Sequence, residues 1–312
     1  MSLGYTDRVS ETVQGTVIAT HGPLVRVQLG KRTLVVASRR RLRWQGAQPE
    51  VSRLVVGDLV EVSLRRDEGV IEAVHERRTA LHRRAPHGHR PQILAANVDQ
   101  AVIVFAARFP EPKRGLIDRF LVACSHAAIE PFLVFNKVDL GADEILPWAD
   151  LYAGLGYPVV LASARTGRGL GEVKRHLQNR TTLFCGPSGV GKSSLLNAVY
   201  PGFRLRVGSI SEATGKGRHT TSRAELMPLP DGGFVVDAPG LKEFGLWNLT
   251  SRELQIAFPE IDRRARGCRF PDCSHIHEPD CTVRAAAEEG EIDADRFRSY
   301  CALAGELSAT AQ

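Results

Sequence analysis

The chain contains a glycine-rich octapeptide at 186–193, Gly-Pro-Ser-Gly-Val-Gly-Lys-Ser, which matches the P-loop pattern G-x-x-x-x-G-K-[ST]. An apolar run precedes it and a helix-like run, 193–200, follows it. Backbone N–H groups of such a loop surround a β-phosphate, and the helix N-terminus adds its positive dipole end. We expect Lys192 to reach the β- and γ-phosphates and Ser193 to bind Mg²⁺. The expected nucleoside triphosphate site comprises Gly186, Pro187, Ser188, Gly189, Val190, Gly191, Lys192, Ser193 and Ser194.

Two further segments fit the γ-phosphate end of such a site. The strand-like run Phe234–Asp237 leads into the tetrapeptide D-x-x-G, in which Asp237 would hold Mg²⁺ through water and Gly240 would contact the γ-phosphate. A polar loop between the two motifs contains Thr220 and Thr221, and one of them would close onto Mg²⁺. Thr221 is favoured, although the spacing does not decide between the two.

A second pair of motifs indicates guanine. Asn136-Lys137-Val138-Asp139 follows the apolar run 131–135, and Ser163-Ala164 follows the apolar run 159–162. The Asp139 carboxylate can accept hydrogen bonds from guanine N1–H and its 2-amino group, a donor pair that adenine lacks. A backbone N–H of the Ser163-Ala164 loop would read the guanine oxygen. The four motifs together predict GTP rather than ATP, with Asn136, Lys137, Asp139, Ser163 and Ala164 around the base.

The residue after the D-x-x-G motif bears on hydrolysis. Many GTPases have a water-orienting glutamine there, whereas this chain has Leu241, which cannot hydrogen bond to water. Intrinsic turnover is therefore expected to be slow, with a partner or another side chain aligning the water. His219 is the nearest candidate in the sequence, so the expected catalytic residues are Lys192, His219 and Thr221.

Three thiols and an imidazole crowd into a short C-terminal stretch: Cys268, Cys273, His275 and Cys281. Cys₃His is a recurrent tetrahedral zinc set and leaves no open coordination position. The sequence thus predicts one structural zinc ion. His277 is the competing nitrogen ligand.

The elements that position these motifs follow from the hydrophobic pattern. Between 93 and 248, apolar strand-like runs alternate with helix-like runs, which predicts a parallel α/β sheet. The expected strands are 101–106, 131–135, 159–163, 181–185 and 233–237, and the expected helices include 114–128 and 193–200. The guanine motifs precede the P-loop, the reverse of the usual order. A helix at 170–178 would join them, so we predict a circularly permuted GTPase.

The N-terminal part differs in pattern and charge. Residues 12–75 read as short alternating strands with turn signals between them, which predicts a small OB-type β-barrel. Residues 1–90 contain 16 Lys and Arg against nine Asp and Glu, within a net charge of +6. This excess suggests a polyanionic partner such as RNA. The basic segment 76–92 is expected to be a linker.

Composition and length limit the class of protein. The 312 residues suffice for several domains, and no apolar run is long enough to cross a bilayer. No signal peptide is evident, so the six cysteines are expected to be reduced in the cytoplasm. We predict a multidomain protein: a barrel at 1–85, a permuted P-loop GTPase domain at 86–248 and a helical zinc domain at 249–312.

With these motifs the chain resembles the ribosome small subunit-dependent GTPase A family of bacteria over nearly its whole length. The resemblance rests on Ala95–Gln100, the P-loop, Gly217–Thr221, Asp237–Gly245 and Cys268–His275. It implies an OB-fold that contacts ribosomal RNA, a role in late maturation of the small ribosomal subunit, and GTP hydrolysis stimulated by that subunit. It also implies that His219 assists hydrolysis and that Cys268, Cys273, His275 and Cys281 bind zinc. We expect a monomer with no membrane partner.

Two other functions remain compatible with the sequence. One is a GTPase switch acting on another structured RNA, such as tRNA. The other is a nucleotide-gated binding module in which hydrolysis is incidental. Stimulation by ribosomal subunits would distinguish the first function from both alternatives.

Overall fold

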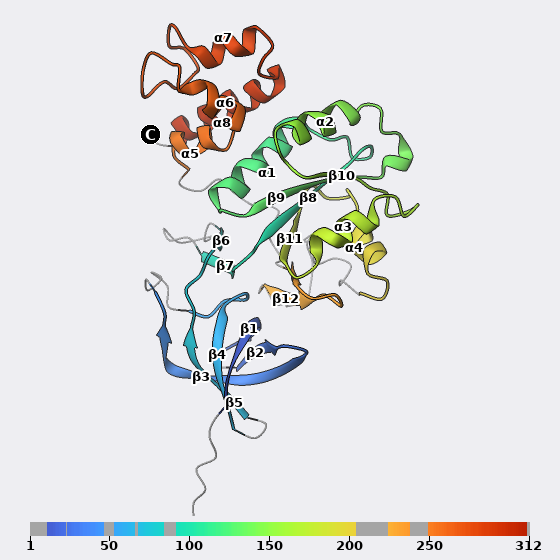
Figure 1. The fold of residues 1–312 in the computed structure, drawn as a ribbon, viewed down its shortest axis with the longest axis vertical. Helices are drawn as coiled ribbons and strands as arrows, with labels where there is room; N and C mark the ends of the chain where they lie inside the picture. Colours follow the sequence, from blue (N-terminus) through green and yellow to red (C-terminus); the bar gives the residue numbers. More distant parts are fainter. Residues whose placement is uncertain are drawn as a thin grey trace, which may run out of the picture.

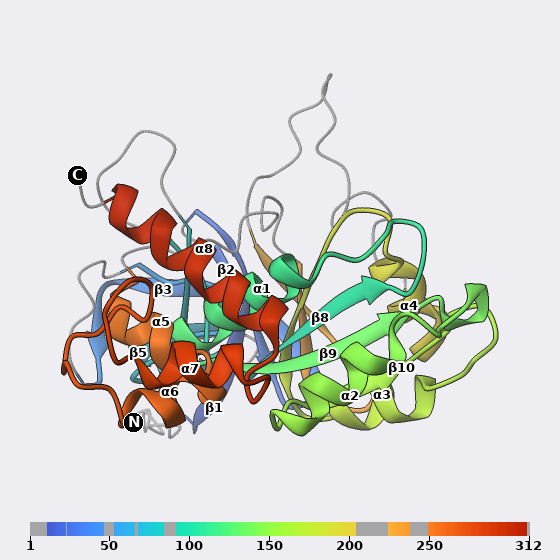
Figure 2. The ribbon, with the colours of Figure 1, turned by 90° about the horizontal axis from the view of Figure 1, so that it is seen from above.

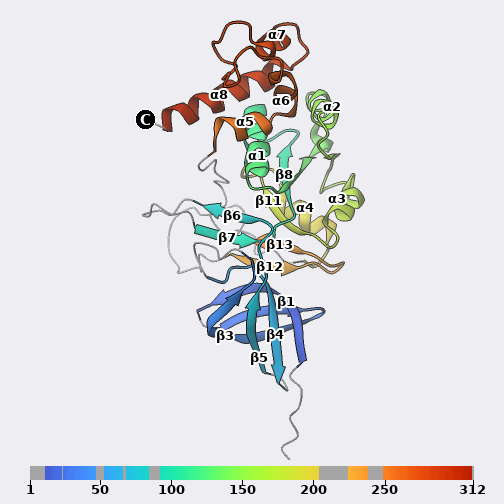
Figure 3. The same cartoon turned by 60° about the vertical axis from the view of Figure 1, so that its left-hand side comes forward.

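Three bodies are stacked end to end along the molecule (Figures 1 and 3). The structure is a computed structural model that describes residues 11–22, 24–46, 53–65, 68–83, 92–203, 224–237 and 249–310. A barrel lies at one end, an α/β domain lies in the middle, and a group of helices caps the other end. None of the helices in these ranges is both long and apolar enough to span a bilayer.

The barrel closes because its last strand in space, β4, pairs with the first, β1. The order around it is β1-β2-β3-β5-β4, with β3 and β5 parallel and the other pairs antiparallel. The strands are β1 (Glu11–His21), β2 (Leu24–Leu29), β3 (Arg32–Trp44), β4 (Leu59–Arg65) and β5 (Glu68–Val74). Buried valines fill its interior, as the alternating pattern requires. The predicted OB-type barrel is confirmed, although β1 and β3 are longer than the expected short strands.

The described part of the segment expected to be a linker, residues 76–83 and Gln92, contacts both neighbouring parts of the chain. It contains β6 (Ala80–Arg83), which pairs with β7 (Gln92–Ala96). Arg77 forms an ion pair at 2.6 Å with Asp58, and both side chains are almost fully buried. The backbone N–H of Arg78 donates to the Asn97 side chain at 2.9 Å. From its basic sequence this segment was expected to be exposed to solvent. Arg77 is buried instead, because it neutralises the buried Asp58 carboxylate of the barrel.

The central sheet has the order β10-β9-β8-β11-β13-β12, in which only β12 runs antiparallel. Its strands are β8 (Gln100–Ala106), β9 (Glu130–Asn136), β10 (Val159–Leu161), β11 (Thr181–Cys185), β12 (Glu225–Pro228) and β13 (Phe234–Asp237). All seven residues of β8 are buried, because helices cover both faces of the sheet. The helices are α1 (Arg114–His126), the 3₁₀ helix η1 (Val138–Leu140), α2 (Leu146–Gly154), α3 (Leu170–Leu177) and α4 (Lys192–Val199). The predicted strands and helices are thus present, with ends that differ by up to two residues.

The path of the chain through the sheet explains the permuted order. From β8 the chain moves outward to β9 and β10, and α3 then returns it to β11 beside β8. The second half continues outward in the other direction, to β13 and β12. The direction reverses between β8 and β11, and open α/β sheets bind ligands at the carboxyl ends of the strands at such a point.

The C-terminal helices pack on the outer side of α1 (Figure 2). They are α5 (Ser251–Ile256), α6 (Pro259–Ala265), α7 (Thr282–Glu288) and α8 (Ala294–Thr310). Thr250 begins α5 with a capping box: its hydroxyl accepts from Glu253 N, and the Glu253 carboxylate accepts from Thr250 N. Val122 of α1 is buried within the apolar cluster of these helices. Helix α1 therefore has buried residues on two sides, toward the sheet and toward the C-terminal helices.

Candidate nucleotide site and metal centre

The predicted P-loop connects β11 to α4, and its glycines are required by close contacts. A Cβ on Gly186 would lie 2.1 Å from the Val104 carbonyl oxygen, and its φ is +127°. A Cβ on Gly191 would lie 2.5 Å from Asn136 Nδ2, with φ at +91°. A residue with a side chain would require movement of the Val104 backbone at position 186 or of the Asn136 side chain at position 191. The loop backbone thus packs directly against β8 and the guanine motif.

Lys192 begins α4, and its side chain turns back over the loop. Its Nζ donates to the carbonyl oxygens of Gly186 at 2.9 Å and Pro187 at 2.8 Å, and the residue is 6% exposed. Ser193, the next residue, is half-buried in the first turn of α4. The loop, the amine and the helix N-terminus together form a cradle of the kind that holds phosphates.

Asn136 ties the guanine motif to the P-loop. Its side chain is 1% exposed, and its Nδ2 donates to the Val190 carbonyl at 2.9 Å. Its Oδ1 accepts from the backbone N–H of Ala164 at 3.2 Å. One buried amide therefore links the P-loop, the end of β9 and the Ser163-Ala164 loop. Segments that occur in reversed order along the chain form one site.

Lys137 follows in a left-handed conformation, with φ at +62°. Its Nζ donates to the Gly189 carbonyl at 2.7 Å and also to the Phe109 carbonyl. The side chain therefore runs from the end of β9 to the P-loop, in the position needed to lay its methylene groups along a base.

The Asp139 carboxylate is held ionised and oriented. Ser163 Oγ donates to it at 2.5 Å, and Arg165 forms an ion pair with it at 2.8 Å. The Ser163 hydrogen bond holds the pKa of Asp139 below its usual value, and a backbone hydrogen bond from Asp139 itself and then the Arg165 charge act in the same direction. The Ser163 hydroxyl in turn accepts from Thr166 N at 3.1 Å. An ionised, oriented carboxylate at this edge of the sheet can accept two N–H donors from one flat ligand.

Asp237 ends β13 on the other side of the P-loop strand. The register pairs Leu183 of β11 with Val236, so Asp237 lies at the carboxyl end of β13 and beside the end of β11. It is half-buried. Serine hydroxyl and carboxylate oxygens are ligands that Mg²⁺ accepts, so Ser193 and Asp237 fit a magnesium-assisted phosphate site. His219, Thr220, Thr221 and Gly240 lie outside the described residues, and their predicted roles stay predictions.

The four C-terminal ligands lie together as the spacing predicted. One donor atom from each of Cys268, Cys273, His275 and Cys281 lies within 4.8 Å of the other three. His275 Nδ1 is 3.5 Å from Sγ of both Cys268 and Cys281, and those two sulfurs are 3.9 Å apart. Two ligands on a tetrahedral zinc ion are separated by about 3.5 to 3.8 Å, given typical Zn–N and Zn–S bond lengths. The donor set therefore fits zinc in its chemistry, and the separations among Cys268, His275 and Cys281 are close to those around a zinc ion.

The neighbouring residues orient the imidazole and settle which histidine joins the cluster. Gln255 Oε1 lies 3.4 Å from His275 Nε2, so Nδ1 is the nitrogen that faces the sulfurs. The side chain of His277 is 81% exposed and lies 4.0 Å from Glu278, away from the cluster. The structure thus favours His275 over the competing His277. The thiols of Cys124 and Cys185 are buried in the α/β core, and burial raises the pKa of Cys185 to about 12.

Two arginines of the basic N-terminal part, Arg39 and Arg43, have partners within the protein. Arg39 forms an ion pair with Glu72 at 2.8 Å, and Arg43 forms one with Glu61 at 3.2 Å. The Arg77 guanidinium lies over the Trp44 ring, 5.1 Å from its centre. Arg39 and Arg43 remain largely exposed, and such exposed pairs are weak enough to exchange for phosphate.

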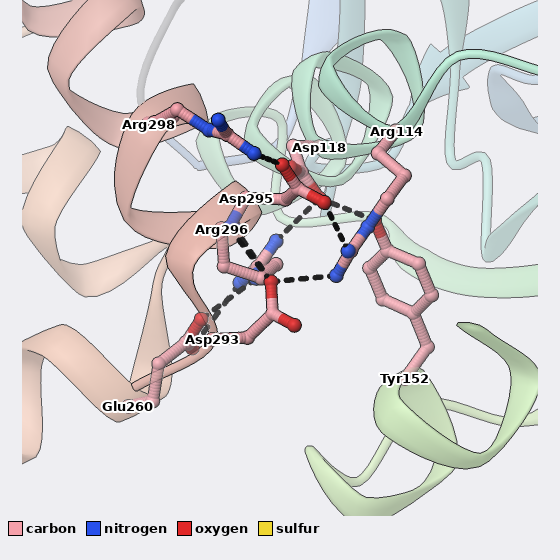
Figure 4. A network of polar contacts seen from close by, with 8 residues as sticks. All are labelled: Arg114, Asp118, Tyr152, Glu260, Asp293, Asp295, Arg296 and Arg298. Atoms are coloured by element: carbon pink, nitrogen blue, oxygen red, sulfur yellow. Dashed lines mark hydrogen bonds and ion pairs between the residues drawn. The ribbon is translucent and has the colours of Figure 1, made fainter. Parts of the chain in front are cut away.

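A network between the domains was not foreseen from sequence (Figure 4). Arg296 of α8 is 1% exposed; its Nη1 donates to Asp118 Oδ1 of α1 at 2.7 Å, and its Nε donates to Glu260 Oε1 at 2.7 Å. Tyr152 donates its hydroxyl to the same Asp118 oxygen at 2.6 Å. The Arg296 guanidinium also lies 4.3 Å from the centre of the Phe258 ring. The local signal was Asp118, a carboxylate one helical turn from the buried Leu121 and Val122 in the helix 114–128.

Arg114 adds a second connection between the same bodies. It begins α1, and its guanidinium donates to Asp293 at 2.6 Å and to Asp295 at 2.5 Å (Figure 4). Burial opposes the charge on Arg296, but hydrogen bonds and the charges of Glu260 and Asp118 outweigh it and raise its pKa. The C-terminal helices are therefore fastened to α1 by buried, charge-assisted hydrogen bonds.

Known proteins resemble this chain over most of its length. The family model described as RsgA GTPase matches residues 74–247. A protein of Gemmatimonas aurantiaca named small ribosomal subunit biogenesis GTPase RsgA is 42% identical, over 82% of this chain and 85% of that protein. A protein of the same name from Moorella thermoacetica is 40% identical, over 95% of this chain and 98% of that protein.

Two solved structures have a similar fold. The crystal structure of YjeQ from Thermotoga maritima has a TM-score of 0.76 at 33% identity, covering 95% of this chain and 99% of that one. The structure of YloQ, described as a circularly permuted GTPase, has a TM-score of 0.75 at 30% identity and covers 99% of both chains. The permuted arrangement predicted from motif order is therefore shared with a known fold.

Proposed function

Since the chain belongs to the RsgA GTPase family, we propose that it hydrolyses GTP while bound to the small ribosomal subunit and assists the late maturation of that subunit in the cytoplasm. The observation that carries this proposal is the buried Asn136 amide. It links the P-loop to the base-reading loop in one site. The partners are GTP, GDP, the subunit and its RNA, and the protein acts as a monomer.

The proposed nucleotide site combines the four sequence motifs with the described geometry. We assign the phosphates to the loop 186–194, and the base to Asn136, Lys137, Asp139, Ser163 and Ala164. We assign Mg²⁺ to Ser193, Asp237 and Thr221, with Thr220 as the alternative. A bound magnesium ion supplies positive charge to the phosphates. The packing of Gly186 and Gly191, the cradle around Lys192 and the ionised Asp139 support these assignments.

We further propose three domains, at 1–85, 86–248 and 249–312, with one structural zinc ion in the last. The donor spacing around His275 and its Gln255 contact support zinc. The hairpin of β6 and β7 crosses the first boundary, so the barrel and the GTPase domain share this connection.

The first test is GTP turnover by the purified protein, alone and with isolated small ribosomal subunits, with ATP as a control. We expect slow basal turnover, because Leu241 cannot orient water, and a large increase with the subunit. If GTP binds but the subunit does not stimulate turnover, the protein would still be a GTPase, and another structured RNA would be its partner. Faster turnover of ATP than GTP would contradict the assignment of the base site.

A variant tests the base-reading carboxylate directly. Asp139→Asn replaces one acceptor oxygen with an N–H donor, which suits xanthine, whose C2 position carries a carbonyl instead of an amino group. We expect weaker GTP binding and stronger XTP binding by this variant. The matched control is Asp143→Asn, an exposed carboxylate in the same loop, which should leave both affinities unchanged.

His219 needs its own test because its role rests on sequence alone. We expect His219→Ala to bind GDP normally and to lose most of the subunit-stimulated turnover. Unchanged stimulated turnover would remove His219 from the mechanism.

A further inference from the structure

The loop from Ala107 to Lys113, between β8 and α1, lies along the side chain of Lys137. Ala107 N donates to the Asn136 carbonyl at 2.7 Å, and the Phe109 carbonyl accepts from Lys137 Nζ. Pro110 packs beside the P-loop, since its Cδ would be 3.7 Å from a Cβ placed on Gly189. The loop thus follows Lys137 from the end of β9 to the P-loop.

Phe109 stands out within this loop for its backbone and for its exposure. Its φ is +49°, in the left-handed region that a bulky residue rarely adopts. Its side chain is 68% exposed, the highest value among the exposed large apolar residues of the described ranges. Backbone strain of this kind persists where the surroundings hold it, and it gathers at ligand sites. Here Lys137 holds the carbonyl of the strained residue, and Pro110 is packed against Gly189.

Two groups already define where a guanine nucleoside must lie. In the proposed site, Asp139 would meet the edge of the base, and the methylene groups of Lys137 would run along one of its faces, because the Lys137 side chain extends to the P-loop and Ser163 orients the Asp139 carboxylate. The Nζ of Lys137 donates to the backbone carbonyl of Phe109, so the backbone that carries the exposed ring lies at the border of the same space. A flat apolar ring at the rim of a nucleoside site gains contact area when the ligand arrives and loses water-exposed surface.

We propose that Phe109 is a positioning residue that covers the nucleoside part of the bound guanine nucleotide. This inference rests on the proposed GTP-binding function and adds an apolar contact that none of the four nucleotide motifs supplies. Stacking on an aromatic ring is tolerant of base identity, because every base has a π-face. Phe109 therefore strengthens nucleotide binding, whereas Asp139 selects the base.

The test compares GDP affinity, measured by calorimetry, for the intact chain and its variants. We expect Phe109→Ala to bind GDP about tenfold more weakly, in the range that loss of one stacked aromatic ring causes. Phe109→Tyr keeps the ring and should retain the affinity. The control is Val35→Ala, which trims another exposed apolar residue, on the barrel, and should change nothing.

Further measurements separate the ring from its backbone. Phe109→Gly relieves the left-handed φ, yet it should lose as much affinity as Phe109→Ala if the ring makes the contact. Inosine diphosphate lacks the 2-amino group that Asp139 reads, so the ratio of GDP to IDP affinity should stay constant in every Phe109 variant. A changed ratio would mean that the substitution disturbs Asp139 or Lys137, and this would overturn the inference.

The inference and the function fail in different ways. If the unaltered chain binds GDP and Phe109→Ala binds it within twofold, the inference alone is wrong. If the unaltered chain binds no GDP, the proposed function is wrong and the inference falls with it.

Discussion

The buried arginine between the domains offers a sharp test of how the C-terminal helices are held. Arg296→Met keeps most of the side-chain volume but removes the positive charge that lies between Asp118 and Glu260. Asp118 is fully buried, so the variant leaves a carboxylate without its cationic partner. Removing one partner of a buried ion pair costs about 3 to 5 kcal/mol. We expect a loss of stability in this range.

Arg298→Met is the matched control. Arg298 is on the same helix and pairs with Asp295, but its side chain is 75% exposed. Exposed ion pairs contribute about 0 to 1 kcal/mol, so this variant should be nearly as stable as the unaltered chain. Both arginines are drawn in Figure 4. The two variants each replace an arginine of α8 with methionine, and they differ in how deeply that arginine is buried.

The assay is urea denaturation in zinc-containing buffer, combined with hydrogen exchange resolved by segment. In Arg296→Met we expect exchange to rise first in α8 and in the face of α1 that carries Asp118. Adding Asp118→Asn to Arg296→Met should recover part of the loss, because the stranded charge is removed. A loss below about 1 kcal/mol in Arg296→Met would refute the reasoning, since it would place the pair among the weak surface contacts.

Three further predictions address the sites themselves. Cys273→Ser should lower the zinc content from about one ion per chain, measured by atomic emission, and should destabilise the C-terminal helices. Ser163→Ala removes the hydrogen bond that most lowers the pKa of Asp139, so the pKa rises. A carboxylate with a higher pKa is protonated earlier as pH falls, so GDP binding should be lost at a higher pH than in the unaltered chain. Gly186→Ala should cost at least about 2 kcal/mol in urea unfolding, because it combines a left-handed φ with contact against a backbone carbonyl.

Two controls accompany these variants. His277→Ala should retain the full zinc content, and a loss of zinc there would return His277 to the ligand set. Gly171→Ala introduces a methyl group into open space within α3, where it should not destabilise the protein. A similar loss in both glycine variants would show that the Gly186 contact is not the cause.

Much of the central domain could be predicted from sequence because its signals are local. A P-loop needs glycines at fixed offsets between a strand and a helix, and 186–193 shows all of these in one stretch. The predicted zinc ligands Cys268 and Cys281 are separated by only 13 positions, so a short stretch of chain brings them together. The permuted order was also visible, since it depends only on which motif comes first.

The motifs, their order and the class of each part of the chain could therefore be predicted from sequence. They depend on neighbouring residues and on the repeat of apolar positions, every 2.0 residues in strands and every 3.6 in helices. Tertiary structure alone decided which distant groups meet. Arg296 lies 178 positions from Asp118, and Arg77 lies 19 from Asp58, and neither arginine differs locally from a solvated one. The choice of His275 over His277 and the contact of Phe109 with Lys137 were likewise settled by the path of the chain. Each of the two arginines is buried only when the folded parts of the chain pack together, and a buried charge without a partner would be costly. No short stretch of sequence shows which distant carboxylate becomes that partner.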